Sequence, residues 1–455
     1  MKKTRPFFTT GYKFIQAKGG ISEYLLIKNG LSVLVMPDHS SPTATLMVTY
    51  RAGSRNEVTG NTGSTHILEH LMFKGSKKFN KKTKHNVWSL ENLGARMNAT
   101  TWLDRTNYYE TVPIEHLDIA MQIEADRMRN AILRDEDLKT EMTVVRNEFE
   151  RGENDPQELL DKEIWASAFT AHPYHHSTIG WKSDIENSNA QALQKFYDTF
   201  YHPNNATVTV IGDIEAGKVL AMVKKYFGAY QRSKNEIPEM HTKEPTQSGQ
   251  RRVIVHRTSE PNTVALAWKI PKALHADAHA IQVLATILSS GKSSVLYRAL
   301  VDHGFATAVR VSAFPTRDPG LFIIYVSLAP RVTHGEVEKL VHETIENLKP
   351  RRPNRKLGVE VPTEASGKGL DRASLARARK LLEAEVAFAR DGSFALASYI
   401  NEAIAIGDWT FFTTFMEKIQ RVSEKDVLRV LEKYFVPEQS TVGHYISTVT
   451  TSHEK

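Results

Sequence analysis

The chain has 455 residues, of which 41% are hydrophobic and 24% are charged, as in ordinary globular proteins. At about 100–200 residues per domain, this length predicts more than one domain. The net charge of +7 is modest, and the basic stretch Lys74–Lys84 is short and interrupted by apolar residues, so we expect no nucleic-acid partner. Apolar runs fall far below the about 20 residues that span a bilayer, so we expect a soluble protein without membrane insertion.

The sequence contains no cysteine, which excludes disulfides, thiolate metal sites and a cysteine nucleophile. Any metal must be held by His, Asp or Glu, and 18 histidines are available. Met1–Arg5 starts like the basic region of a signal peptide, but Pro6–Lys18 lacks the apolar core that such a signal needs. We therefore expect a bacterial periplasmic location only if a signal peptide was removed, and a cytoplasmic location otherwise.

Strand and helix patterns alternate along the first half of the chain. Tyr24–Met36 predicts two strands joined at Asn29-Gly30, and Thr43–Arg51 predicts a third strand. Ser64–Phe73 then predicts a helix that Ser64 or Thr65 caps and Gly75 ends. The further predictions are two strands within Ala95–Val112, helices at Ile114–Arg129, Asp135–Glu153 and Ala190–Phe200, a strand at Ala206–Ile211 and a helix at Ala216–Tyr230.

The two halves of the chain resemble each other. Residues 233–250 lack periodicity and predict a linker between an N-terminal domain at 24–232 and a C-terminal domain at 251–448. Lys349–Asp371 predicts a surface loop in the second domain. The segment YHPNNATV (Tyr201–Val208) has a counterpart in FVPEQSTV (Phe435–Val442), and ILEHLMFKG (Ile67–Gly75) can be laid over VLATILSSG (Val283–Gly291). Chance similarity between helix ends is the alternative, but the shared order of the matches favours a duplicated α+β unit.

The duplication assigns the polar chemistry to the first half alone. His66, Glu69 and His70 correspond to Gln282, Ala285 and Thr286. The second domain is therefore predicted to be a homologous domain without a metal site.

His66 and His70 lie in the segment HILEH, which is the sharpest chemical feature of the chain. On a helix, residues four apart share one face, and two imidazoles so placed can bind one Zn²⁺ at about 2.0–2.1 Å. Glu69 borders that face and could take a proton from a metal-bound water, whose pKa zinc lowers toward about 7. About one random chain in twenty of this composition would contain such a segment, so the alternative of an amphipathic helix with a satisfied histidine pair stays open.

The helix at Asp135–Glu153 offers candidates for a third ligand. They are Glu136, Glu141, Glu148, Glu150 and Glu153. Glu141 and Glu148 lie two turns apart on one face, where they flank the apolar pair Val144 and Val145. A solvated acidic face is the alternative, and the spacing alone does not choose between them.

With Glu141 and Glu148 after it, the inverted HxxEH segment resembles the inverzincin metallopeptidases, the pitrilysin, insulinase and processing-peptidase family. Further segments resemble that family over about Tyr24 to Ile446. They are GARMNATT (Gly94–Thr101), His172-Pro-Tyr174, Ile179-Gly180, Tyr201–Asn204 before Gly212-Asp213, and NEAIAIGDW (Asn401–Trp409). The resemblance implies two homologous α+β domains, each a mostly antiparallel sheet packed with helices, which together form half of a clam-shaped chamber.

The resemblance also implies roles for single residues of a zinc metalloendopeptidase. His66, His70 and Glu148 match the three zinc ligands, and Glu69 matches the general base. Glu141 matches a second carboxylate that supports the site. Asn98, Ala99 and Thr100 match an edge strand that receives an extended or unfolded peptide substrate as an added strand. Without the resemblance, an ordinary strand and turn would be preferred there.

One departure from the family concerns an Arg and a Tyr that active members place over the substrate. Val301 stands where the Arg is expected and Thr307 where the Tyr is expected, while Tyr297 and Arg298 lie out of register. We therefore expect the chain to be the zinc-bearing subunit of a heterodimer whose homologous partner supplies the pair. A solitary chain or a homodimer is the alternative for assembly, and a non-catalytic structural or assembly subunit is the alternative for function.

Overall fold

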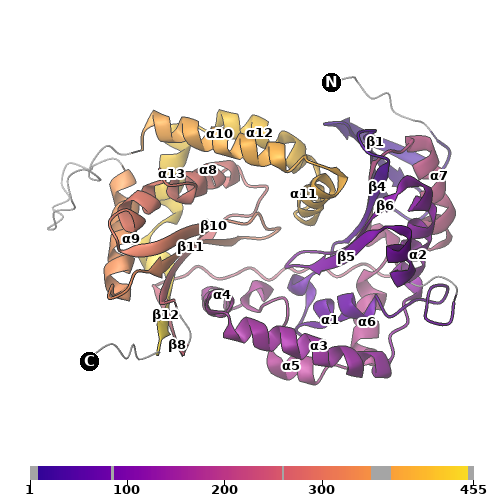
Figure 1. The fold of residues 1–455 in the computed structure, drawn as a ribbon, viewed down its shortest axis with the longest axis horizontal. Helices are drawn as coiled ribbons and strands as arrows, with labels where there is room; N and C mark the ends of the chain where they lie inside the picture. Colours follow the sequence, from indigo (N-terminus) through magenta and orange to yellow (C-terminus); the bar gives the residue numbers. More distant parts are fainter. Residues whose placement is uncertain (1–8, 84–86, 259–260, 350–369, 449–455) are drawn as a thin grey trace. The chain divides into compact units, whose positions relative to one another are not determined.

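The computed structural model describes residues 9–83, 87–258, 261–349 and 370–448, which form two compact units (Figure 1). The first unit comprises the described part of residues 1–149, 176–241 and 389–413, and the second comprises that of 150–175, 242–388 and 414–455. Each unit thus contains one segment that comes from the other half of the chain. The domain boundaries expected at 24–232 and 251–448 refer to continuous halves and stay a prediction.

A seven-stranded sheet forms the centre of the first unit, with the strand order β1-β2-β3-β7-β4-β6-β5. Its strands are β1 (Tyr12–Lys18), β2 (Ile21–Leu26), β3 (Leu31–Pro37), β4 (Thr43–Tyr50), β5 (Arg96–Thr101), β6 (Thr106–Pro113) and β7 (Ala206–Gly212). Neighbours are antiparallel except for β3 and β7. The hairpin expected at Asn29-Gly30 is confirmed, and Gly30 has a positive φ of 76°. Sequence analysis missed β1, because this edge strand is largely exposed and lacks apolar alternation.

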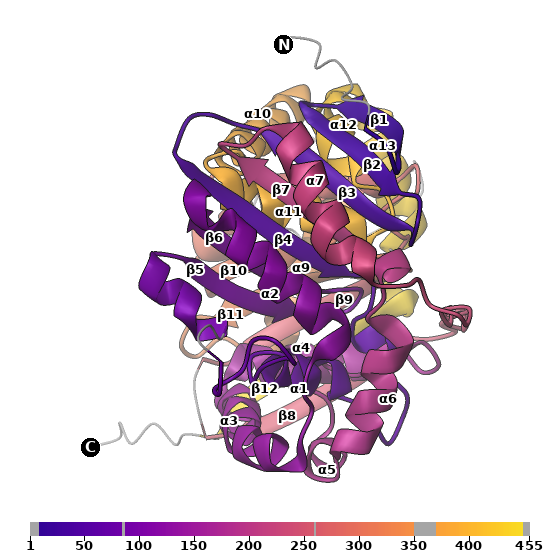
Figure 2. The ribbon, with the colours of Figure 1, turned by 90° about the vertical axis from the view of Figure 1, so that its right-hand side faces the viewer.

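Helices cover both faces of this sheet, which explains the continuous burial along β4 (Figure 2). The helices of the first unit, not all of which touch the sheet, are η1 (Ser54–Asn56), α1 (Ser64–Leu71), η2 (Val87–Leu93), η3 (Ile114–His116), α2 (Leu117–Asn130), α3 (Asp135–Asn154), α5 (Lys182–Glu186), α6 (Ala190–Phe200), η5 (Pro203–Asn205), α7 (Ala216–Tyr226), η6 (Phe227–Ala229) and α11 (Ser393–Ala405). Leu46 and Val48 of β4 join the core formed with α2 and α7. On the other face, Thr49 Oγ1 donates a hydrogen bond of 2.7 Å to Asn401 Oδ1 of α11.

The second unit repeats this topology around a five-stranded sheet with the order β10-β11-β9-β12-β8. Its strands are β8 (Arg251–Arg257), β9 (Thr263–Ile270), β10 (Ala306–Ser312), β11 (Gly320–Leu328) and β12 (Ser440–Ser447). Reversed, the order β8-β12-β9-β11-β10 matches β3-β7-β4-β6-β5 strand for strand, and the single parallel pair, β8 with β12, falls at the same place. The predicted α+β fold with two homologous domains is confirmed.

The two units exchange equivalent helices. The second unit contains α4 (Pro156–Ala168), η4 (Pro173–His175), α8 (Ala278–Ser289), η7 (Tyr297–Val301), α9 (His334–Leu348), α10 (Arg372–Phe388), α13 (Glu424–Tyr434) and η8 (Pro437–Gln439), while α3 and α12 (Thr410–Arg421) each span a boundary between units. In this unit α4 packs on β8, β9 and β12, as α11 packs on β4, β6 and β7 in the first. Each sheet is thus covered by a helix from the other half of the chain.

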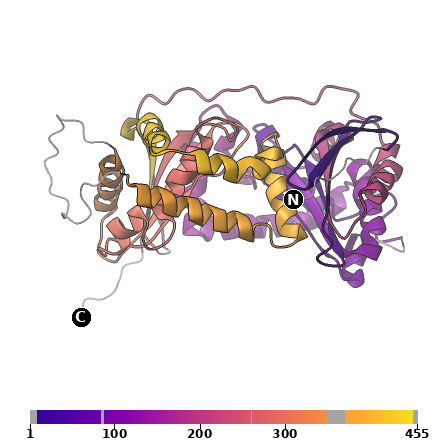
Figure 3. The ribbon, with the colours of Figure 1, turned by 90° about the horizontal axis from the view of Figure 1, so that it is seen from above.

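The segment expected to be a linker contains no helix or strand over residues 233–250 (Figure 3). It is nevertheless anchored, because the Glu244 carboxylate accepts backbone N–H groups of Thr170, Ala171 and His172 at 2.9–3.1 Å. The loop expected at Lys349–Asp371 lies almost wholly outside the described residues. Within the described ranges, no helix has the length and apolar character needed to cross a bilayer.

Candidate metal centre

Helix α1 is fixed by its apolar face against α3. Ile67 and Leu71 are fully buried and share an apolar cluster with Leu138, Met142 and Val145 of α3. His66 directly precedes Ile67 and His70 directly precedes Leu71. The two histidines are therefore also four residues apart, and they lie on the adjacent side of α1. Packing of the two helices therefore brings the imidazoles next to the carboxylates of α3.

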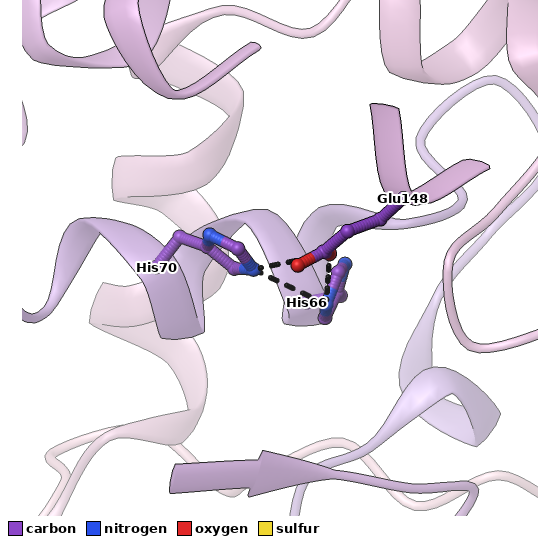
Figure 4. Close-up of side chains that lie close together, drawn as sticks. All are labelled: His66, His70 and Glu148. Atoms are coloured by element: carbon purple, nitrogen blue, oxygen red, sulfur yellow. Dashed lines mark hydrogen bonds and ion pairs between the residues drawn. The ribbon is translucent and has the colours of Figure 1, made fainter. Parts of the chain in front are cut away.

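The structure brings His66, His70 and Glu148 together (Figure 4). The two Nε2 atoms lie 3.3 Å apart, and Glu148 Oε2 lies 3.5 Å from that of His66 and 3.6 Å from that of His70. Ligand atoms at about 2.0–2.1 Å from a tetrahedral ion would be separated by about 3.3–3.4 Å. A His₂Glu set with these separations fits Zn²⁺ and leaves a fourth position for water or substrate.

The His66 imidazole is in the form that a metal requires. Burial, and to a smaller extent the nearby His70, lowers the pKa of His66 to about 3, so the ring is neutral at physiological pH. Its buried Nδ1 has no hydrogen-bond partner among the described residues. A largely buried, neutral imidazole that faces a second imidazole is poorly explained by packing alone and well explained by metal ligation.

Glu141 supports the second ligand from behind. Its Oε2 lies 3.2 Å from His70 Nδ1, and its Oε1 forms an ion pair with Lys74. Burial alone would raise the pKa of Glu141, but the contacts with Lys74 and His70 outweigh this effect and lower it. An ionised carboxylate at Nδ1 holds the proton on that atom and leaves Nε2 free to bind a metal. Sequence analysis missed this role of Lys74, which it considered only as part of the short basic stretch Lys74–Lys84.

Glu69 lies on α1 between the two histidines and is nearly buried, with 9% of its surface exposed. Thr101 Oγ1, at the end of β5, donates a hydrogen bond to Glu69 Oε2. Burial raises the pKa of Glu69, opposed by this hydrogen bond and by His70 and Arg105. A carboxylate with a raised pKa is a stronger base than one in water, which suits proton abstraction.

The residues expected to bind substrate lie on β5, at one end of the seven-stranded sheet. Asn98 and Thr100 are exposed, whereas Ala99 is buried. The amide of Ala99 donates to Asn98 Oδ1 at 2.9 Å, and Arg105 Nη1 donates to the Thr100 carbonyl at 3.0 Å. The strand reaches the Glu69 carboxylate through Thr101, but its role in binding stays a prediction.

The cap predicted for α1 is wrong. Neither Ser64 nor Thr65 caps the helix, which begins after Gly63 in a left-handed conformation with φ of 83°. Instead the distant Glu57 carboxylate accepts the amides of Gly63 and Thr65. Sequence reasoning could not find this cap, because the usual signal is a polar side chain at the helix start.

Two family models match the chain in succession. The model described as "Insulinase (Peptidase family M16)" matches residues 32–182, and the model described as "Peptidase M16 inactive domain" matches residues 187–355. The chain belongs to the insulinase-type peptidase family M16. The first match contains all the residues of the candidate centre, whereas the second contains Val301 and Thr307, where the Arg and Tyr are absent.

Similar proteins extend over most of this M16 chain. A protein named zinc protease PqqE from Helicobacter pylori is 29% identical over 92% of this chain and 91% of its own length. A probable mitochondrial-processing peptidase subunit beta from Schizosaccharomyces pombe is 26% identical over 90% of this chain and 88% of its own. The crystal structure of a protease from Helicobacter pylori superposes with a TM-score of 0.85 at 28% identity, covering 94% of this chain and 100% of that chain.

Proposed function

We propose that this chain is a zinc-dependent endopeptidase that hydrolyses extended or unfolded peptides. The observation that carries the proposal is the convergence of two imidazole nitrogens and one carboxylate oxygen at 3.3–3.6 Å, beside the nearly buried Glu69. Relatives that are named zinc proteases support the same conclusion.

His66, His70 and Glu148 would hold the zinc ion, which when bound supplies Lewis-acid chemistry that polarises a carbonyl and makes water more acidic. Glu69 then acts as the general base, and its Oε1, which does not hold the Thr101 hydrogen bond, takes the proton from water. The same carboxyl delivers that proton to the leaving amine, so that Glu69 ends each cycle ionised. His70 is kept in one orientation by Glu141 and Lys74 throughout.

An extended peptide would bind by adding a strand to the edge formed by β5. Asn98 Oδ1 accepts the backbone N–H of Ala99 in the chain as described, so substrate would exchange this intrachain bond for its own. Backbone pairing recognises an extended chain with little regard to side chains. This mode of binding therefore favours unfolded segments over folded proteins.

We further propose that a homologous partner chain completes the active site. The side chain of Val301, at the end of η7, carries no hydrogen-bond donor, and the short hydroxyl of Thr307, exposed on β10, donates to the Ser327 carbonyl at 3.3 Å. The similarity to a protein named as a subunit of a processing peptidase supports this division of labour. A homodimer or a solitary chain of lower activity is the alternative assembly.

A non-catalytic structural subunit is the second candidate function, and the missing Arg and Tyr are the observation that favours it. The intact set of His66, His70, Glu148 and Glu69 weighs against it, because a purely structural chain has no need of two adjacent carboxylates and two imidazoles in one cluster. The metal content of the purified chain separates the two functions.

The decisive experiment is zinc analysis of the wild-type chain and of two matched variants on α3. We expect one zinc per chain at neutral pH, loss of zinc in Glu148→Gln, and full retention in Glu150→Gln, whose carboxylate lies two residues further along the same helix. Absence of stoichiometric zinc from the wild type would refute the peptidase proposal. Equal zinc in both variants would refute the ligand assignment.

A further inference from the structure

The helix that carries the candidate ligands starts in an unusual way. With only eight residues, α1 is far shorter than the about 12–15 residues that an isolated helix needs for stability. The first N–H groups of a helix have no partner within it and need an outside acceptor. The position of His66 and His70 therefore depends on what holds the start of α1.

An ordinary capping side chain cannot stand at the start of α1. A Cβ atom at Gly63 would lie 2.3 Å from the carbonyl oxygen of Ile179, and one at Gly180 would lie 2.5 Å from the Gly63 nitrogen. Both glycines also have positive φ values, of 83° and 89°. Close backbone contact with the segment around Gly180 thus excludes the Ser, Asp or Asn that usually caps a helix.

Glu57 supplies the missing cap from six residues upstream. Its Oε2 accepts the Gly63 amide at 2.9 Å and its Oε1 accepts the Thr65 amide at 2.7 Å. The Glu57 side chain is wholly buried, and burial raises its pKa to about 8, although the Thr65 and Gly63 hydrogen bonds oppose this shift. A carboxyl group buried in this way needs hydrogen-bond partners, and the amides at the start of α1 supply them.

A second carboxylate secures the loop between Glu57 and α1, which we call the capping loop (residues 57–63). Asp184 Oδ2 accepts the amides of Gly60 and Thr62 at 3.0 and 3.1 Å and the Thr62 hydroxyl at 2.7 Å. Thr62 Oγ1 in turn accepts the Trp181 amide at 2.9 Å. The loop is thus held at both ends, and the first turn of α1 has little freedom to move.

We propose that Glu57 is a positioning residue for the metal centre, with Asp184 as its support. By binding the amides on both sides of Ser64, Glu57 sets the rotation of the first turn and hence the direction of His66, one residue after its contact at Thr65. The inference rests on the proposed function, because it requires that His66, His70 and Glu148 bind zinc. Preorganised ligands lose less freedom when the ion binds, so the capping loop should raise zinc affinity.

The alternative is that Glu57 is only a stabilising helix cap, and the chain offers a matched control for it. Glu244 is also a largely buried carboxylate that accepts backbone amides, those of Thr170, Ala171 and His172, but in the second unit. In Glu57→Gln and in Glu244→Gln, the side-chain NH₂ group replaces one of the two accepting oxygens. It then faces a backbone N–H, and the hydrogen bond from that N–H is lost. Both variants should lose stability, and only the first should affect the metal.

The test measures zinc dissociation constants of the full chain by competition with a chromophoric chelator, together with the visible absorption spectrum of the Co²⁺-substituted protein. For Glu57→Gln we expect about 10–100-fold weaker zinc binding and a changed Co²⁺ spectrum, the range found for residues that orient ligands. For Glu244→Gln we expect wild-type affinity and spectrum. Asp184→Asn, at a less buried site, should weaken zinc binding by about 10-fold, the lower end of that range, while the chain folds.

Each outcome decides the question. Wild-type zinc affinity and spectrum in Glu57→Gln would overturn the inference and leave the proposed function intact. Equal weakening in Glu244→Gln would also overturn it, because a general loss of stability would then explain the effect. If Glu57→Gln does not fold, Asp184→Asn decides: weakened binding supports the inference and unchanged binding overturns it. A wild-type chain without zinc would instead refute the proposed function, and the inference with it.

Discussion

Replacement of Glu69 by Gln is the sharpest test of the chemistry proposed for this chain. The change removes the basic oxygen and keeps the size and shape of the side chain. Thr101 can donate to the Gln carbonyl oxygen as it does to the carboxylate, so the contact between α1 and β5 should survive. His66, His70 and Glu148 are untouched, and zinc should be retained.

The expected loss of rate follows from the surroundings of Glu69. A general base typically contributes about 10²–10⁴-fold to the rate, which is about 2.7–5.4 kcal/mol of activation free energy. Two other carboxylates lie beside the histidines. Glu148 would hold the zinc ion, and Glu141 is engaged by Lys74 and His70, so neither can take over the proton. With no substitute base in the cluster, we expect the upper part of the range, about 10³–10⁴-fold.

The assay is hydrolysis of an unfolded, internally quenched peptide by the wild type and by Glu69→Gln, with zinc content and thermal midpoint measured on the same preparations. The expected result for Glu69→Gln is a full zinc complement, a thermal midpoint close to that of the wild type and a turnover about 10³–10⁴-fold lower than that of the wild type. Undiminished turnover with full zinc would refute the assignment of Glu69 as the base. Loss of zinc would show instead that Glu69 helps to hold the ion.

Three further predictions concern the partner, the exchanged helix and the response to acid. Addition of a homologous chain that carries the Arg and Tyr should raise peptide hydrolysis by about 10²–10³-fold, and equal activity of the chain alone would contradict the heterodimer. Gly443→Val should lower the thermal midpoint by an amount equivalent to about 1–3 kcal/mol, because a Cβ atom there meets Leu160 and Ile164 of α4 at 2.8 Å; an unchanged midpoint would show that α4 does not pack on β12 as described. Burial acts to raise the pKa of Asp277, but hydrogen bonds from Tyr434, Arg429 and Lys433 outweigh it and lower the pKa to about 2. Its ionised form is therefore favoured by folding, and the stabilisation is present above about pH 4 and is lost as the pH falls toward 2. Asp277→Asn should cost about 2 kcal/mol at neutral pH and little at pH 2, which thermal unfolding across this range would measure.

The candidate centre shows which parts of a site can be predicted from the spacing of residues in the sequence. The HxxEH spacing predicted that His66 and His70 share a face of a helix, and the structure confirms this, because helical periodicity depends on sequence neighbours alone. By its position on the helix alone, Glu148 was no better a candidate for the third ligand than Glu136, Glu150 or Glu153. The family resemblance pointed to Glu148, and the packing of α1 on α3 through Ile67 and Val145 gives the physical reason, since that contact fixes which face of α3 meets the histidines.

Hydrogen bonds between distant residues account for most of what sequence analysis missed. In the sequence, Lys74 is only the first residue of a short basic stretch, and the tertiary structure places Glu141 of α3 beside it. Glu57 reads as an ordinary loop carboxylate until the approach of Gly180 to Gly63 leaves the start of α1 without room for a cap. Such contacts depend on where loops fold back, which no periodicity records.

The sequence by itself determined the classes of structure and chemistry open to this protein. Without cysteine, a metal centre had to use His and carboxylate ligands, and the repeated motifs indicated two homologous α+β domains. The tertiary structure alone decided that equivalent helices, α4 and α11, are exchanged between the two units. The physical reason is that the apolar face of a helix can be buried by any complementary sheet, so its hydrophobic pattern records that the face is covered and not which sheet covers it.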